Sequence, residues 1–355
     1  MRISLVMIVK NEARTLRRCL ESVSNLVDEI VIVDTGSTDQ TQMIASEFQA
    51  RIFQYEWQSD FGDARNFALG KSTCEWSLVL DADEYISNDC ADAIHEFIHQ
   101  GSAIGKIKLV DKFMSNDRIN YELSYNSRLF PSNCRYSGKI HEQVESDLPR
   151  RRVDIEIQHD GYLNQLKTDR NIPILLKVIE ENPEDPYYHY QIAKEYRGLN
   201  SHEQSYVHLK RAYTTITRKE GYAPSLIVNY LYAIMASGNL AEGLSVVENE
   251  QDYLSDHPDF HFVSALYLLE LILSDPNQYG ELMPYIERFY LRALEIGETA
   301  QEGSVIGTGS FAAHHNLGVF YEVTGDIEKA EKQYMYAKEY DYAPSIERLS
   351  SLKSS

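Results

Sequence analysis

The stretch Trp76-Ser77-Leu78-Val79-Leu80-Asp81-Ala82-Asp83-Glu84 decides the fold of the first part of this chain. A short apolar run bounded by polar residues is typical of a strand buried in a parallel sheet. Because the run ends in three carboxylates, we expect Asp81 and Asp83 at the carboxyl end of that strand, where ligands of open α/β sheets bind. An acidic loop without function is the alternative for an isolated Asp-x-Asp, so the surrounding segments must decide between a functional site and such a loop.

Short apolar runs and amphipathic segments alternate on both sides of this stretch up to about residue 160. Repeated strand–helix units of this length predict parallel pairing and right-handed crossovers. A Ser-x-x-Gln capping box from Ser37 to Gln40 is expected to open one of the helices. Strands are predicted at 3–9, 30–33, 51–55, 76–80, 104–113, 127–130 and 152–158, and helices at 13–23, 40–48 and 61–69.

Helical hairpins are expected to replace the strands beyond about residue 165, which predicts one domain at 1–165 and another at 166–355. The later part shows the residue offsets of a tetratricopeptide repeat. One copy is expected around 186–217 and another around 311–344, with weaker copies at 224–250 and 258–298. An ordinary helical bundle is the alternative. The second copy rests on Leu317, Gly318, Tyr321, Gly325, Ala330, Tyr334 and Ala337.

The composition excludes several kinds of partner. The net charge of −20 leaves no basic field for nucleic acid or for simple docking on anionic membranes. No run of about 18 apolar residues is present, so no membrane-spanning helix is expected. The four cysteines have no metal-type spacing and are interpreted as reduced thiols of a cytoplasmic protein.

The carboxylates of Asp81 and Asp83 predict a metal-assisted site. Two carboxylates at this spacing repel each other unless a cation lies near them. Oxygen ligands suit a hard divalent ion, Mg²⁺ or Mn²⁺, whose remaining positions are filled by water and phosphate. The residues alone therefore indicate a site for a phosphorylated substrate.

Three segments in order resemble a family 2 glycosyltransferase of the GT-A fold over roughly residues 1–160. They are residues 4–12, residues 30–39 and the Asp81–Glu84 stretch. The attached repeats resemble the tetratricopeptide-bearing branch of that family, which includes peptide S-glycosyltransferases of the sublancin type and bacterial proteins with unassigned acceptors. The resemblance implies a Rossmann-like mixed sheet followed by an all-α repeat domain. It also implies inverting transfer of a sugar from a UDP- or GDP-sugar.

The resemblance assigns the nucleotide pocket to the ends of the first two strands. Asp34 would lie against the base, with Val9, Asn11 and Glu12 bordering the same pocket. A turn- or helix-capping role is the alternative for Asp34.

The resemblance assigns the diphosphate and the metal to three further residues. Asp83 would ligate the metal directly, and Asp81 would lie near the ribose and the metal. Arg65, in an Ala-Arg-Asn segment, would bind phosphate oxygens in bidentate fashion. A salt bridge to a nearby aspartate at the helix start is its alternative.

The acid–base residue is expected at His141-Glu142, after the later strands. Glu142 would be the general base and His141 a metal or phosphate ligand, or the two roles would be exchanged. The repeats would dock a peptide or protein acceptor or join two copies of the chain. The alternatives are a glycan or lipid-linked acceptor, a repeat-based binding protein with a degenerate enzyme domain, and a nucleotidyltransferase. The last normally has a Gly-rich basic loop where this chain has Val9-Lys10-Asn11-Glu12.

Overall fold

The computed structural model describes residues 1–115, 118–159, 168–299, 301 and 303–352. Its contacts divide the chain into two units, Met1–Glu181 and Asn182–Ser355. The predicted boundary after residue 165 lies outside the described residues and stays a prediction.

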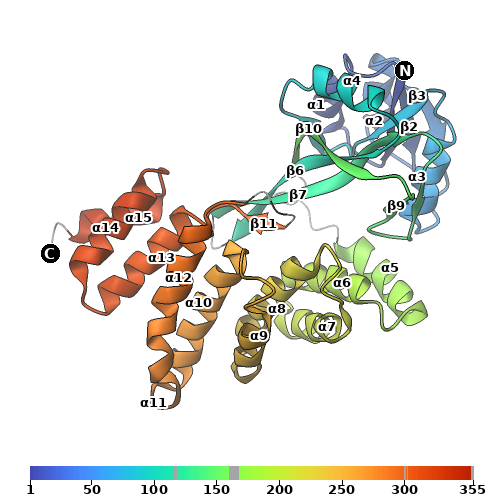
Figure 1. Ribbon diagram of the computed structural model, residues 1–355. Coiled ribbons are helices and arrows are strands. Elements are labelled where there is room, and N and C mark those ends of the chain that lie inside the picture. Colours follow the sequence, from blue (N-terminus) through green and yellow to red (C-terminus); the bar gives the residue numbers. More distant parts are fainter. Residues whose placement is uncertain (116–117, 160–167, 300, 302, 353–355) are drawn as a thin grey trace. The chain divides into compact units, whose positions relative to one another are not determined.

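A mixed sheet forms the centre of the first unit (Figure 1). Its strands follow the order β3-β2-β1-β4-β7-β6-β10-β5. The first four are parallel, β7 is antiparallel to both β4 and β6, β10 is parallel to β6, and β5 is antiparallel to β10. The strands are β1 (Ile3–Val9), β2 (Glu29–Asp34), β3 (Arg51–Gln54), β4 (Trp76–Val79), β5 (Glu84–Ile86), β6 (Ile104–Ser115), β7 (Arg118–Pro131) and β10 (Arg150–His159).

The two faces of this sheet carry different layers. Helices α1 (Leu16–Val23), α2 (Thr41–Glu47) and α4 (Ala91–His99) contribute their apolar side chains to one buried cluster with the sheet. Helix α3 (Phe61–Leu69) and the hairpin of β8 (Arg135–Ser137) and β9 (Gln143–Glu145) pack into the cluster on the other face. Helix α5 (Thr168–Glu181) ends the unit. Successive side chains of β1 and β4 point to opposite faces of the sheet, so each strand contributes buried residues to both clusters. This is expected for a sheet covered on two sides.

The predicted α/β architecture is confirmed, with local differences. The strand at 3–9 and the helix at 61–69 have the predicted bounds. The capping box at Ser37 was wrong, because Asp39 accepts the Thr41 N–H at 2.9 Å while the Ser37 hydroxyl accepts the Asn11 N–H at 2.9 Å. Strand β5, helix α4 and the β8–β9 hairpin were not predicted, since each is short or lies between stronger patterns.

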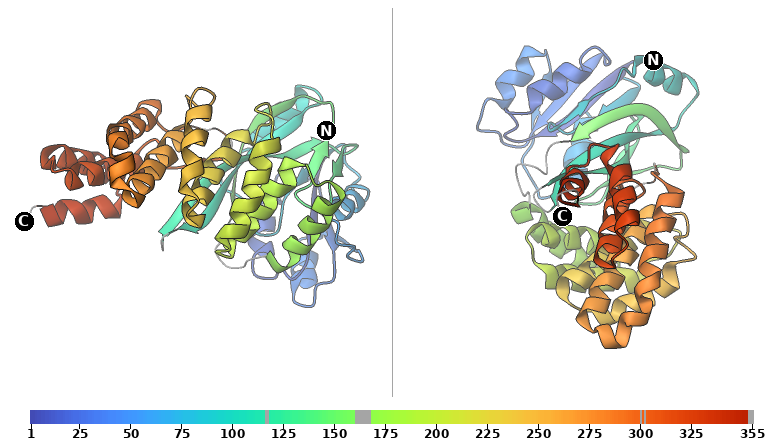
Figure 2. Two further views of the ribbon diagram at one scale, coloured as in Figure 1. Left: turned by 90° about the horizontal axis from the view of Figure 1, so that it is seen from below. Right: turned by 90° about the vertical axis from the view of Figure 1, so that its left-hand side faces the viewer.

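Successive helices packed side by side make up the second unit, as both views of Figure 2 show. The predicted repeats are confirmed as helix pairs, and short helical turns near residue 275 separate the two main helices of the copy at 258–298. The main helices are α6 (Pro186–Gly198), α7 (His202–Thr215), α8 (Ala223–Ser237), α9 (Gly243–Glu250), α10 (Pro258–Ser274), α12 (Met283–Ile296), α13 (Phe311–Val323), α14 (Ile327–Lys338) and α15 (Ala343–Leu352). The shorter elements are η2 (Leu240–Glu242), α11 (Pro276–Tyr279), η3 (Gly280–Leu282) and β11 (Ser304–Val305).

Gly318 shows why the repeat needs small residues at fixed offsets. A Cβ atom at this position would lie 2.6 Å from Cε1 of Tyr334, whose side chain is fully buried. The Tyr334 hydroxyl donates to Glu322 Oε2 at 2.6 Å, which fixes the ring in place. The absence of a side chain at Gly318 therefore lets α13 and α14 approach closely.

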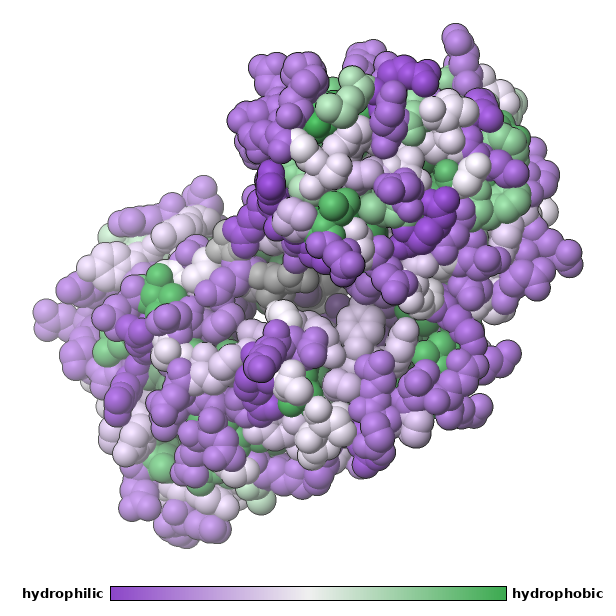
Figure 3. All heavy atoms as spheres, turned by 45° about the vertical axis from the view of Figure 1, so that its right-hand side comes forward, coloured by the Kyte–Doolittle hydropathy of each residue, from purple (hydrophilic) through white to green (hydrophobic). Residues whose placement is uncertain are grey.

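The surface agrees with the composition. The face in Figure 3 is mostly hydrophilic, with hydrophobic residues in small separate groups. Within the described part of the chain, no helix combines the length and apolar character that crossing a membrane requires. All four cysteines are free and buried.

Candidate active site

A tight turn follows β4 and carries the Asp-Ala-Asp segment. The Asp81 N–H donates to Glu84 Oε2 at 2.8 Å, and the Glu84 N–H donates to the Asp81 carbonyl at 3.1 Å. The turn leads directly into β5, so three carboxylates lie at the carboxyl end of β4, as the sequence predicted. Asp83 and Glu84 are only 6% and 2% exposed.

Two arginines hold the Asp81 carboxylate from both sides. Arg65 Nη2, from α3, is 2.8 Å from Asp81 Oδ1, and Arg128 Nη2, from β7, is 3.2 Å from Asp81 Oδ2. Arg128 Nη2 is also 2.5 Å from Glu84 Oε1, and Arg65 Nε donates to Glu142. The resulting chain of ion pairs runs Glu142–Arg65–Asp81–Arg128–Glu84 and brings three predicted site residues together.

Burial sets the electrostatics of this ion-pair chain. Burial alone would lower the pKa of Arg65 and of Arg128, but the adjacent carboxylates outweigh it and raise both pKa values. Burial raises the pKa of Glu84 to about 7, against the opposing effect of Arg128. Both guanidinium groups therefore stay charged, as buried arginines do when paired with carboxylates.

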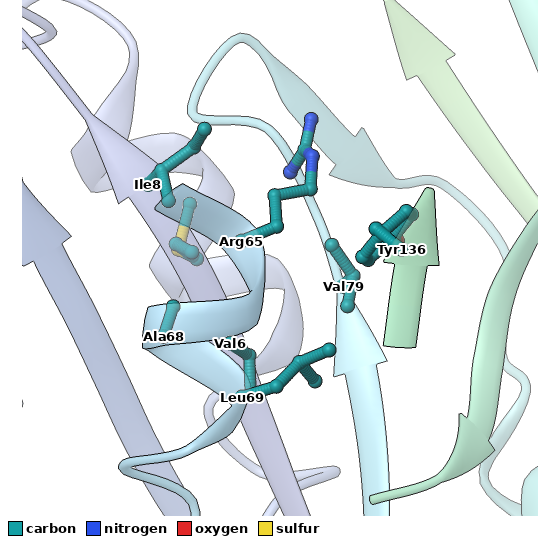
Figure 4. Close-up of a pocket in the computed structure, with 8 residues that line it drawn as sticks. Val6, Ile8, Arg65, Ala68, Leu69, Val79 and Tyr136 are labelled. Carbon is teal, nitrogen blue, oxygen red and sulfur yellow. The ribbon is translucent and has the colours of Figure 1, made fainter. Parts of the chain in front are cut away.

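Three buried polar atoms beside these ion pairs lack hydrogen-bond partners among the described residues: Arg65 Nη1, Arg128 Nε and Tyr136 Oη. The Arg65 guanidinium lies over the Tyr136 ring, 5.6 Å from its centroid. Figure 4 shows Arg65 extending from α3 between Ile8 and Tyr136. The gap beneath it, bounded by Val6, Leu69 and Val79 among others, is too narrow for a water molecule.

A second set of charged side chains joins Asp83 to His159 at the end of β10. His159 Nε2 is 3.4 Å from Asp83 Oδ2, and His159 Nδ1 is 2.6 Å from Asp111 Oδ1. The strand register produces this arrangement, because His159 pairs with Glu84 of β5 on one side and with Asp111 of β6 on the other. Burial lowers the pKa of His159, but its bonds to Asp111 and Asp83 outweigh that effect and raise the pKa to about 10.

The chemistry of Asp83 and His159 suits a divalent cation. Among the described residues no group of three or more His, Cys, Asp or Glu side chains is arranged to hold a metal ion. Mg²⁺ and Mn²⁺ sites often use only one or two protein ligands and complete their shells with water and substrate phosphate. Asp83 offers an oxygen, and His159 would offer Nε2 once a metal displaces the proton that its contacts with Asp83 and Asp111 favour, whereas both carboxylate oxygens of Asp81 already accept from arginines. The residues present fit a metal completed by a phosphorylated ligand.

The predicted nucleotide-binding residues form hydrogen bonds within and between the two loops that follow β1 and β2. Asp34 is fully buried, and its Oδ1 accepts from the N–H groups of Gly36 at 2.9 Å and Ser37 at 2.7 Å. Its Oδ2 accepts from Gln42 Nε2 at 2.5 Å. These contacts favour the turn-capping role for Asp34, and its contact with a base stays a prediction.

The loop after β1 is held to the loop after β2 by hydrogen bonds. The Asn11 side-chain oxygen accepts the Thr38 N–H at 2.7 Å, and the Glu12 N–H donates to Thr41 Oγ1 at 2.7 Å. The Val9 carbonyl accepts the Thr35 N–H at 3.0 Å. Val9, Asn11 and Glu12 therefore border one loop cluster with Asp34, as predicted, while their part in binding stays a prediction.

His141 and Glu142 lie in the segment that leads into β9. His141 adopts the left-handed backbone region with φ of 51°, which turns the chain next to Glu142. Glu142 is ion-paired with Arg65, and the role of His141 as a metal or phosphate ligand stays a prediction. His159, Asp111 and Tyr136 were not predicted as site residues, and Arg128, although it precedes the predicted His141-Glu142 segment in one constellation, was given no role. The available signal for His159 was a polar residue directly after a predicted strand.

Comparison with known proteins supports the first unit as an enzyme domain. Residues 4–148 match the family model described as glycosyl transferase family 2, which confirms the predicted family for this region. A TPR repeat-containing protein of Synechococcus elongatus is 34% identical over 203 residues, which are 52% of this chain and 50% of that protein. The prophage-derived glycosyltransferase SunS of Bacillus subtilis is 26% identical over 302 residues, 79% of this chain and 60% of that protein. The chain thus spans half to three fifths of the length of these relatives.

Solved structures that are similar to parts of this chain include residues 1–349 of TarS from Staphylococcus aureus. That structure is 16% identical, covers 68% of this chain and 92% of its own, and gives a TM-score of 0.36. The structure of MamA is 15% identical and covers 49% of this chain and 88% of its own, with a TM-score of 0.38.

Proposed function

Because residues 4–148 belong to glycosyl transferase family 2, we propose that this chain is an inverting glycosyltransferase that uses a nucleotide-sugar donor, a UDP- or GDP-sugar. One observation carries the proposal. The Asp-Ala-Asp turn at the end of β4 lies within a chain of ion pairs that joins Arg65, Arg128 and Glu142. A carboxylate, two buried cations and a second carboxylate are the groups that metal-assisted departure of a diphosphate requires.

Asp83 and His159 would hold Mg²⁺ or Mn²⁺, which when bound supplies positive charge for the departing diphosphate. Asp111 fixes the orientation of the His159 ring through the bond to Nδ1. Asp81 does not need to ligate the metal, since its carboxylate holds Arg65 and Arg128 in position. The two guanidinium groups would supply positive charge to the donor phosphates, and their raised pKa values keep them charged.

Glu142 would act as the general base in a single displacement. It takes the proton from the acceptor hydroxyl or thiol as the acceptor atom forms its bond to the anomeric carbon. The bond between that carbon and the phosphate oxygen breaks in the same step, and its electron pair leaves on the nucleoside diphosphate. The products are the inverted glycoside and the nucleoside diphosphate, with the acceptor proton on Glu142.

The repeat unit would present the acceptor. Stacked helical repeats offer an extended surface that suits a chain-like ligand better than a small sugar. Together with the resemblance to peptide-modifying members of the family, this favours a peptide or protein acceptor. A second copy of this chain on the same surface is the alternative occupant, and a glycan or lipid-linked acceptor is the alternative substrate.

The test is a screen of UDP- and GDP-sugars with the full chain, measuring release of nucleoside diphosphate in Mn²⁺ and in excess chelator. We expect release with at least one donor, and loss of about 10²-fold or more in chelator and in Asp83→Asn. Asp89→Asn is the matched control, because Asp89 is exposed and lies six residues away, in the connection between β5 and α4. Equal release by Asp83→Asn and the unmodified chain, or no release with any donor, would refute the proposed function.

A further inference from the structure

We propose that Asn66 is a positioning residue for catalysis, which sets the register of the β8–β9 hairpin on α3 and thereby holds Glu142 beside the acidic turn. This inference rests on the proposed function, in which Glu142 is the base. The sequence assigns a role to Arg65 in the Ala-Arg-Asn segment but none to Asn66.

The side-chain amide of Asn66 binds β8 in the way that a neighbouring strand would. Its Nδ2 donates to the Tyr136 carbonyl at 2.9 Å, and its Oδ1 accepts the Tyr136 N–H at 2.8 Å. Figure 4 shows Tyr136 on β8 beside α3, near the Arg65 side chain that extends from the helix. An amide offers a donor and an acceptor together, whereas a carboxylate can only accept. The residue type at position 66 therefore matches both backbone groups of Tyr136.

Two contacts between backbones hold the next residues of the hairpin on the same helix. The Phe61 N–H, which belongs to the helix turn that has no intrahelical acceptors, donates to the Lys139 carbonyl at 2.7 Å. Gly62 approaches Gly138 so closely that an added Cβ would lie 2.4 Å from the Gly138 carbonyl oxygen. Helix α3 therefore holds the hairpin across residues 136–139, directly before the predicted acid–base residues.

The same helix also joins the hairpin to the acidic turn. Arg65, which precedes Asn66, pairs through Nη2 with Asp81 at 2.8 Å and through Nε with Glu142. The position of Glu142 relative to Asp81 is thus set by where the hairpin lies on α3. A shift of the hairpin along the helix would carry Glu142 away from the turn.

Apolar packing by itself does not fix this register. Tyr136 and Val144 of the hairpin share a buried cluster with Leu69 of α3, but hydrophobic contact is non-directional. Hydrogen bonds weaken steeply with distance and angle, so the pair made by Asn66 resists sliding. A base must lie within hydrogen-bond reach of the proton it takes, and misplacement by about 1 Å can cost about 10²-fold in rate. Asn66 therefore acts on the reaction through Glu142, without contact with the substrate.

The main experiment separates turnover from binding. Release of nucleoside diphosphate is measured with the full chain for the unmodified protein, Asn66→Asp and Gly62→Ala, and UDP and GDP are titrated calorimetrically in Mn²⁺. We expect kcat to fall by about 10²-fold in Asn66→Asp, because the carboxylate cannot donate to the Tyr136 carbonyl. Gly62→Ala should act in the same direction, because the added methyl group pushes the Gly138 carbonyl away. Affinity for the nucleoside diphosphate should change by less than about threefold, since neither substitution removes a predicted ligand.

A second measurement does not depend on activity. Hydrogen exchange of the backbone amides of residues 140–145 is followed by mass spectrometry. Exchange in Asn66→Asp should be faster by about tenfold or more, because a hairpin that has lost its anchor opens more readily. Should Asn66→Asp fail to fold, as judged by its thermal transition, Asn66→Ser replaces it. Its hydroxyl can keep one of the two bonds, so both effects should be smaller and of the same sign.

Asn25→Asp is the matched control. Asn25 is exposed in the turn after α1, and its substitution adds the same charge to the same unit without touching the hairpin. It should change neither kcat nor the exchange of residues 140–145 by more than about twofold.

Unchanged kcat in Asn66→Asp, or in Asn66→Ser where that variant is used, would overturn the inference. So would unchanged exchange across residues 140–145, equal effects in Asn25→Asp, or a loss of nucleotide affinity as large as the loss of kcat, which would mark general damage to the site. Faster exchange in the Asn66 variant, with no release of nucleoside diphosphate from any donor by the unmodified chain, would support the anchoring of the hairpin while refuting the proposed function. The two failures are therefore distinguishable.

Discussion

Replacement of Asp259 by Asn should remove one component of the pH dependence of stability in the repeat unit, namely the loss of stability that ionisation of this carboxyl causes as the pH rises. Asp259 lies in the first turn of α10 and is 6% exposed. Its Oδ1 accepts from the Val305 N–H at 2.9 Å and from Thr308 Oγ1 at 3.2 Å, both neutral donors. Burial raises the pKa of Asp259 from 3.8 to about 7, with a smaller contribution from nearby Glu298 and opposition from the two hydrogen bonds. The folded state therefore favours the protonated carboxyl.

The sign and size of the effect follow from this difference. A carboxyl whose pKa is higher in the folded state stabilises that state fully below the unfolded pKa, and the contribution is lost as the pH rises through about 7. One pKa unit corresponds to about 1.36 kcal/mol, so a rise of roughly three units gives a loss of up to about 4 kcal/mol between pH 4 and pH 8. The amide introduced by Asp259→Asn cannot ionise, so the variant should lack this slope.

The assay is urea unfolding of the full chain followed by circular dichroism at several pH values, comparing the unmodified protein, Asp259→Asn and Asp252→Asn. Asp252 is exposed and lies seven residues before Asp259, which makes it a matched loss of charge. The free energy of unfolding of the unmodified protein should fall relative to Asp259→Asn as the pH rises, with most of the change completed by about pH 8. A difference between these two proteins that stays constant from pH 4 to pH 8 would refute the reasoning.

Three further changes test the site and the packing. Glu142→Gln should lower sugar transfer by about 10²–10⁴-fold because the acceptor proton then has no base, measured under saturating donor and acceptor; retention of full transfer would assign the base elsewhere. Asp111→Asn should weaken Mn²⁺ binding by about 10–100-fold in calorimetry because the amide no longer supplies the negative charge that faces His159 Nδ1, and unchanged affinity would remove Asp111 from the metal site. Gly318→Ala should destabilise the repeat unit by about 1–2 kcal/mol, because crowding against Tyr334 outweighs the gain in helix propensity. Gly280→Ala, with no atom within 4 Å of the added Cβ, should change the free energy of unfolding by less than about 1 kcal/mol, and equal effects of the two substitutions would contradict the packing argument.

Much of the fold was predictable because its signals are local. The apolar run before Asp81 specifies a buried strand, and the alternation around it specifies parallel strand–helix units, which the sheet order of β1 to β4 confirms. The offsets of Gly318 and Ala330 specify helices that pack closely, since helical period and side-chain size are read within one hairpin. The ends of predicted strands also indicated the right edge of the sheet for Asp81 and Asp83.

The partners of those carboxylates were decided by the tertiary structure. Arg128 meets Asp81 across 47 residues of sequence, and Glu142 meets Arg65 across 77. The Arg128 contact depends on β7 pairing antiparallel with β4, and the Glu142 contact depends on the β8–β9 segment packing against α3, where Asn66 exchanges hydrogen bonds with Tyr136. His159 reaches Asp83 only because β10 lies between β6 and β5. Hydrophobic periodicity states which face of a strand is buried but not which strand lies beside it. The sequence by itself therefore determined the strand ends, the repeats and the acidic turn, whereas the tertiary structure determined which arginines, histidine and further carboxylate surround that turn.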